Sequence, residues 1–141
     1  MKPPPKDWPR ISSALFYDDA SAAIDWLCKA FGFVVRLRVD GEDGSVVHSE
    51  LEFGEGLVMV GSKNAEKHHQ SPASLGGANT QNLCVQIEDC DAHHARARAA
   101  GARIYHEPQV TDYGAEYWSD KGYGALDLEG HRWYFAQRLR G

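Results

Sequence analysis

The chain has 141 residues, of which 43% are hydrophobic and 25% are charged, and its formal net charge is −5. This composition is typical of one globular domain with a buried core, and it excludes a disordered chain. The acidic balance, with no basic stripe, argues against nucleic acid as a partner. No apolar run is long enough to span a membrane.

The N-terminal segment and the cysteines bear on location. The segment Met1–Lys6 is rich in proline and lacks the apolar core of a secretory signal. Cys28, Cys84 and Cys90 are odd in number and form no C-x-x-C spacing, which is typical of free thiols in a reducing compartment. We therefore predict a cytoplasmic protein without a membrane partner.

The first half of the chain predicts one strand, one helix and three further strands. Asp18 and Asp19 are candidate N-caps of the helix, and Gly32 ends it. Apolar residues at spacings of three and four give this helix a buried stripe. The helix is expected over 20–31 and the strands over 11–17, 33–40, 46–53 and 57–60.

The same order then repeats. A polar, glycine-rich connector is followed by a second strand–helix–strand pattern, in which Asp89 and Gly101 take the places of Asp19 and Gly32 about 70 residues later. The helix is expected over 91–100 and the strands over 83–87, 103–106, 123–128 and 131–137. We predict one domain over 1–141, with a first βαβββ module at about 10–61, a connector at 62–80 and a second module at about 81–138. The predicted class is α+β.

Several segments resemble one family. They are LFYDD at 15–19, AIDWL at 23–27, FGF at 31–33, HSEL at 48–51 and ALDLEGHRW at 125–133. Together they resemble the glyoxalase/bleomycin-resistance/dioxygenase superfamily, also called vicinal oxygen chelate proteins, over residues 11–137. The last segment is similar to the family's Asp-Pro-Asp/Glu-Gly-His-x-Trp turn, with leucine in place of proline. The resemblance implies two βαβββ modules whose mixed sheet curls around a cleft, and a homodimer.

The resemblance also indicates where a metal would bind. Family enzymes use His, Glu or Gln from the first and last strands of each module as ligands of a divalent metal. The matching positions here are Ser12, Met59, Asn82 and Tyr134. A hydroxyl, a thioether, an amide and a phenol are poor ligands for such a cation. We therefore predict neither a metal at this place nor another cofactor.

Period-two alternation predicts which side chains enter the cleft. Val47, Leu51 and Phe53 should pack toward the helix, which leaves His48 and Glu50 facing the cleft. The predicted wall also includes Tyr123, Ala125 and Asp127. The predicted ligand-binding residues are His48, Glu50, Met59, Asn82, Cys84, Gln86, Tyr123, Arg132 and Tyr134.

Some of these residues allow two interpretations. His48 and Glu50 form either an acid/base pair or displaced metal site, or a polar pair in a wet cavity, and the polar pair is preferred. Cys84 is either a nucleophile or a small packing residue, with packing preferred. The aromatic residues between Tyr113 and Tyr123 form either a lid or a packing surface, and both interpretations stay open.

Three function classes follow from these features. The first is a small-molecule-binding protein of the superfamily with a degenerate metal site, which sequesters an organic compound or antibiotic. The alternative is a metal-dependent lyase, isomerase or dioxygenase that uses a displaced site near His48 and Glu50. The third is a regulatory or structural dimer with a vestigial pocket.

Overall fold

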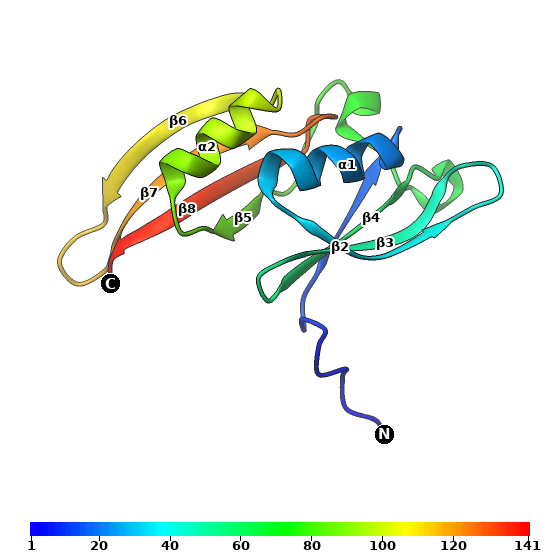
Figure 1. Ribbon diagram of the computed structural model, residues 1–141, viewed down its shortest axis with the longest axis horizontal. Coiled ribbons are helices and arrows are strands. Elements are labelled where there is room, and N and C mark those ends of the chain that lie inside the picture. The colour runs from blue at the N-terminus through cyan, green and yellow to red at the C-terminus, as the bar shows by residue number, and fades with distance from the viewer.

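The computed structural model describes all 141 residues and places two similar units in one chain (Figure 1). The first unit contains β1 (Ser13–Tyr17), α1 (Ala20–Phe31), β2 (Val34–Asp40), β3 (Val46–Phe53) and β4 (Gly56–Ser62). The second repeats this order with β5 (Leu83–Gln86), α2 (Cys90–Ala99), β6 (Arg103–Asp112), β7 (Ser119–Leu126) and β8 (Arg132–Arg140). The α+β class and the two βαβββ modules are therefore confirmed.

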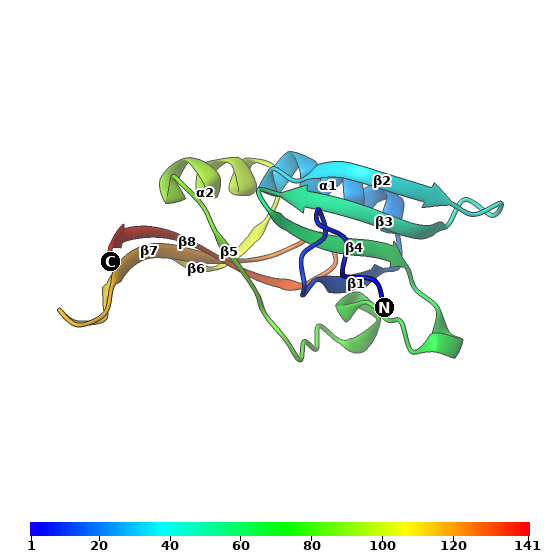
Figure 2. The ribbon, with the colours of Figure 1, turned by 90° about the horizontal axis from the view of Figure 1, so that it is seen from below.

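The two sheets share one topology. Their strand orders are β1-β4-β3-β2 and β5-β8-β7-β6. In each sheet the first strand pairs in parallel with the last, and the remaining pairs are antiparallel. Both helices lie on one side of the curled sheets (Figure 2). We call the sheet side turned away from the helices the first outer face in the β1–β4 sheet and the second outer face in the β5–β8 sheet.

The two helices begin in the same way but are buried to different extents. The side chains of Asp19 and Asp89 accept hydrogen bonds from the amides of Ala22 and Ala92, both at 3.0 Å, and so cap α1 and α2. Helix α1 buries an apolar stripe, whereas α2 buries only Cys90 among its first residues and Ala97 later on. Arg96 and Arg98 of α2 are exposed to water, whereas its two histidines are half-buried. The stripe of α1 consists of Ala20, Ala23, Ile24, Leu27, Ala30 and Phe31.

One hydrophobic core joins the two modules. Phe31 of α1 packs against Trp133 and Phe135 of β8, with ring centroids 5.3 and 4.7 Å apart. The cluster of buried apolar residues includes members of both sheets and both helices. Neither α-helix combines the length and the apolar character needed to cross a bilayer.

A buried carboxylate also links the modules. The hydroxyl of Tyr17 on β1 donates to Oδ2 of Asp127 at 2.6 Å, and the indole Nε1 of Trp133 donates to the same oxygen at 3.0 Å. Burial and the charge of Asp127 raise the pKa of the Tyr17 hydroxyl, so it remains a donor. Asp127 thus satisfies one buried donor from each module.

The turn that follows Asp127 holds the start of α1. The carboxylate of Glu129 accepts from the amides of Asp18 and Asp19 at 2.7 and 2.8 Å. The ring Nε2 of His131 donates to the carbonyl of Phe16 at 2.9 Å. A turn near the end of the chain therefore satisfies backbone groups near its beginning.

The hairpin of β6 and β7 is longer than predicted. Strands were expected over 103–106 and 123–128, but β6 continues to Asp112 and β7 starts at Ser119. The loop between them is therefore short, and its residues Tyr113, Tyr117 and Trp118 are exposed. Strand β6 is an edge strand, where polar residues and proline are tolerated, so its sequence resembles a loop.

A bulge changes which side of β3 one valine faces. Val39 pairs with His48 and Asp40 pairs with Val46, so Val47 has no partner on β2. Val46 is buried, whereas Val47 is 66% exposed. The prediction that Val47 packs toward the helix is therefore wrong, although Leu51 does enter the core.

Candidate functional site

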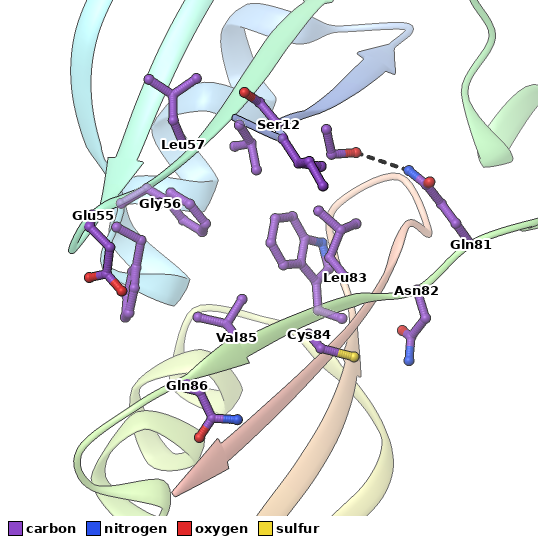
Figure 3. A pocket seen from close by; sticks show the side chains of 16 residues that line it. Ser12, Glu55, Gly56, Leu57, Gln81, Asn82, Leu83, Cys84, Val85 and Gln86 are labelled. Atoms are coloured by element: carbon purple, nitrogen blue, oxygen red, sulfur yellow. Dashed lines mark hydrogen bonds between the residues drawn. The ribbon is translucent and has the colours of Figure 1, made fainter. Parts of the chain in front are cut away.

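A cavity with a volume of about 480 Å³ lies between the modules (Figure 3). Its aromatic lining comes from Phe33 and Phe53 of the first module and Trp133 of the second. Segments at the edge strands β1 and β5 form its walls, and the Gln81 amide donates to the Ser13 hydroxyl across them at 2.9 Å. A volume of this size is within the range of small-molecule sites.

Three of the predicted ligand residues border this cavity without projecting into it. Asn82, Cys84 and Gln86 line it, but their side chains point away, whereas Leu83 and Val85 point inward (Figure 3). This is the alternation that the sequence predicts for β5. The cavity is therefore mainly apolar, and the predicted polar side chains lie on the second outer face.

The second outer face carries two tyrosines on bare backbone. A Cβ at Gly122 would overlap the ring of Tyr134, and a Cβ at Gly124 would overlap the ring of Tyr105. Both glycines lie on β7 two residues apart, so they share this face. Each ring can lie this close to the sheet only because the residue beneath it has no side chain.

Two further contacts fix the position of the Tyr105 ring. The hydroxyl of Tyr105 donates to the carbonyl of Trp133 at 2.9 Å. The guanidinium carbon of Arg132 lies 3.9 Å from the centroid of the Tyr105 ring, which is a cation–π contact. Cys84 is exposed and in register with Tyr134. We call Tyr105, Tyr134 and Arg132 the tyrosine platform.

On the first outer face, charged side chains pair with one another. His48 Nε2 lies 2.7 Å from Glu50 Oε2, and Arg36 Nε lies 3.4 Å from Glu50 Oε1. Glu50 is 6% exposed. The guanidinium of Arg36 also donates to the carbonyl of Asp7 at 2.7 Å and lies 5.5 Å from the ring of Trp8. The N-terminal arm therefore lies against this cluster.

The residues at the family's metal positions match a divalent metal poorly. Met59 is in register with Glu50 on the first outer face, and Tyr134 is in register with Cys84 on the second. The phenol of Tyr134 extends over Gly122. A thioether and a neutral phenol, together with the hydroxyl of Ser12 and an amide, do not supply the carboxylate or imidazole donors that such a cation needs.

Tyr123 is not part of either outer face, and its predicted place in the cleft wall is wrong. It is fully buried on the helix side. His93 Nε2 donates to the carbonyl of Phe31 at 2.8 Å, so the Tyr123 hydroxyl donates to Nδ1 at 2.6 Å. Burial raises the pKa of Tyr123 and lowers the pKa of His93. Ala125 and Asp127 are buried with Tyr123, and the two glycines occupy the outer positions instead.

Sequence reasoning missed Tyr105, Gly122 and Gly124. A partial signal was present, because glycines two residues apart in a strand leave one face of that strand bare, but Gly122 lies before the strand predicted over 123–128. Tyr105 gives a weaker signal, since a bulge between Ile104 and His106 decides its direction. Of the predicted residues, Arg132 and Tyr134 do belong to the platform.

Comparisons with known proteins point to one family. The chain is 35% identical over 136 residues to the uncharacterized protein Mb0911c of Mycobacterium bovis, which covers 94% of this chain and 85% of that protein. It is equally similar, at 35% identity over 136 residues, to Rv0887c of Mycobacterium tuberculosis, of which it covers 76%.

Solved structures agree with these relatives. The crystal structure of TioX from Micromonospora sp. ML1 has 35% identity and a TM-score of 0.71, and the match covers 93% of this chain and 99% of TioX. A glyoxalase I mutant from Zea mays has 18% identity and a TM-score of 0.70, covering 91% of this chain and 44% of that one, so its likeness shows the fold alone. The family model of the Glyoxalase/Bleomycin resistance protein/Dioxygenase superfamily matches residues 10–135, and the chain belongs to this superfamily.

Proposed function

We propose that this protein binds a small organic molecule with a flat ring on its second outer face and that it acts by sequestering this molecule. The observation that carries the proposal is Tyr134. It occupies a position at which the family's enzymes place a metal ligand, yet its phenol lies directly over Gly122. Beside it lie the ring of Tyr105 and the stacked guanidinium of Arg132. Flat aromatic and guanidinium groups side by side favour stacking of a planar ligand.

The first outer face supports binding over metal-dependent catalysis. Both oxygens of Glu50 lie near donors, namely His48 at 2.7 Å and Arg36 at 3.4 Å. The guanidinium already balances the charge of this carboxylate, which leaves little attraction for a metal cation. The pair of His48 and Glu50 fits a structural role in a polar cluster better than a displaced metal site.

We further propose that the protein works as a homodimer. Strand β2 is an edge strand, and Val34, Val35, Leu37 and Val39 on it are all exposed. An exposed apolar edge strand favours association with another chain. Light scattering after size exclusion should give twice the chain mass, and Leu37→Lys should reduce it to one chain. A monomeric unaltered protein would contradict this part of the proposal.

The platform can be tested with acridone, a neutral and planar aromatic compound. Acridone should stabilise the protein in a thermal-shift assay, and Gly122→Ala should weaken its binding at least about fivefold because the added methyl displaces the Tyr134 ring. The matched control is Gly61→Ala on β4, where the nearest neighbour is the Phe16 ring at an ordinary 3.7 Å.

Two results would contradict the proposal. One is acridone binding that Gly122→Ala leaves unchanged. The other is stoichiometric zinc, nickel, iron or manganese in protein purified without chelator, if Tyr134→Phe removes that metal. The second result would favour the lyase, isomerase or dioxygenase alternative.

A further inference from the structure

Asp120 is a buried carboxylate without a partner on the second outer face. It lies on β7 two residues before Gly122 and therefore faces the same way. The residue is 7% exposed, and its Oδ1 is buried with no hydrogen-bond partner. A buried carboxylate that lacks a partner carries a large desolvation cost, so such groups normally meet a donor or a cation.

The chain's own nearby cations are engaged elsewhere. Arg138 pairs in register with Asp120, but its guanidinium donates to the carbonyl of Gly141 at 3.2 Å and lies 5.0 Å from the ring of Trp118. Arg140 pairs with Asp112 at 2.9 Å. The charge of Asp120 therefore remains available to a group from outside the chain.

Asp120 continues the row that the tyrosine platform begins. Along β7, the ring of Tyr105 covers Gly124 and the ring of Tyr134 covers Gly122, with Asp120 next. After burial, the charge of Asp120 is the largest cause that raises the pKa of Tyr134, which shows that the two groups are close. The opposite end of the row carries the positive charge of Arg132. The row therefore has a positive and a negative end.

A second unpartnered atom lies beside the same row. Nδ1 of His106 is buried without a hydrogen-bond partner, and its ring meets that of Tyr134 edge-on at a centroid distance of 6.0 Å. His106 is in register with Gly124. Two unsatisfied polar atoms beside one aromatic surface indicate that polar groups of a ligand complete this face.

We propose that the ligand of this platform is a planar aromatic cation whose protonated nitrogen binds the carboxylate of Asp120 while its ring stacks on Tyr134. This inference rests on the proposed function and adds the charge and orientation of the ligand. An ordered water could donate to Oδ1, but it would not balance the charge. A protonated nitrogen does both, and it keeps the positive part of the ligand away from Arg132.

The test compares acridone with 9-aminoacridine, which has a similar ring system but is protonated at neutral pH. In the unaltered protein, 9-aminoacridine should bind at least about tenfold more tightly than acridone, as a charge-assisted hydrogen bond predicts. Asp120→Asn should abolish that preference, chiefly by weakening the binding of 9-aminoacridine. The matched control is Asp91→Asn, which removes the same charge from α2, where Asp91 pairs with Lys121.

The outcomes separate the inference from the proposed function. If both compounds bind equally well and Asp120→Asn changes neither affinity, the amine assignment is wrong while the stacking site stands. If neither compound binds, the proposed function itself fails. If Asp91→Asn removes the preference as fully as Asp120→Asn, net charge explains it and the assignment to Asp120 is overturned.

Discussion

The two outer faces have the same strand order and opposite chemistry. On the first, Arg36, Glu50 and His48 satisfy one another, and the N-terminal arm lies against them. On the second, glycines expose the backbone to two tyrosine rings, and Asp120 has no partner. The comparison shows that the strand order alone does not decide the chemistry of a sheet face. Only the second outer face keeps buried polar atoms without a partner, and this is why we propose it as the binding face.

Substitutions in the hairpin turns before β4 and β8 should show the largest difference in stability between the modules. Asp127→Ala leaves the Tyr17 hydroxyl and the Trp133 indole without their buried acceptor. The free energy of unfolding should fall by about 3–5 kcal/mol, measured by urea denaturation. In the first module, Glu55 lies in the corresponding turn and is exposed, so Glu55→Ala should change stability by about 0.5 kcal/mol or less. Equal losses of stability in the two variants would show that the two turns stabilise the fold to the same extent.

Glycine-to-alanine substitutions on the two outer faces should show the next largest difference in stability. Gly124→Ala places a methyl group inside the ring of Tyr105 and should cost about 1–3 kcal/mol of stability, since the ring must leave its position. Gly61→Ala on β4 meets only ordinary contacts and should be near neutral. Urea denaturation of both variants measures the difference. A tolerated Gly124→Ala would contradict the close packing of Tyr105 on Gly124.

A smaller difference between the two helices should appear in the pH dependence of stability. Burial lowers the pKa of His93 on α2 below its ordinary value of 6.5. The unfolded chain therefore takes up a proton that the folded chain does not. The neutral His93 side chain contributes its full stability at a pH above its pKa in the unfolded chain. This contribution falls as the pH drops toward its lower pKa in the folded chain.

Thermal unfolding of His93→Gln, followed from pH 7 to about 5, tests this. The variant should lose less stability than the unaltered protein over this interval, although it starts lower because ring packing is lost. The matched control is His68→Gln in the exposed connector, which should keep the original pH dependence. If His93→Gln left the pH dependence of stability unchanged, the burial of His93 would not contribute to that dependence.

The smallest effect is expected at the arm. Arg36→Ala removes two contacts with glutamates and the link to Asp7. Because Arg36 is partly exposed, the stability loss should be about 1 kcal/mol or less. Limited proteolysis should nevertheless cut the N-terminal arm faster in this variant than in Arg38→Ala. Equal cleavage rates would show that the arm does not depend on Arg36.

Sequence patterns predicted the regular elements well because those depend on local signals. Helix α1 follows from its caps and stripe, and its bounds match the expected range. The repeat was visible because Asp89 and Gly101 recur in the places of Asp19 and Gly32. The length of β6 was missed because edge strands tolerate a loop-like composition.

The site was harder to predict because it depends on phase and on contacts between distant residues. The directions of Val47 and Tyr105 depend on bulges, which composition does not reveal. Tyr123 was placed on the wrong face because an aromatic residue suits both a core and a ligand wall. Tyr134 and Arg132 were placed on one face because the strand period of two holds through β8.

The bonds of Glu129 and Asp127 with the first module have a consequence for folding order. They join residues 110 or 111 positions apart. Contacts of such separation form late, since a long loop must close before they contribute. During synthesis, the amides at the start of α1 cannot bond to the carboxylate of Glu129 until that residue is added near the end of the chain. The duplicated modules should therefore acquire their full stability together rather than one after the other.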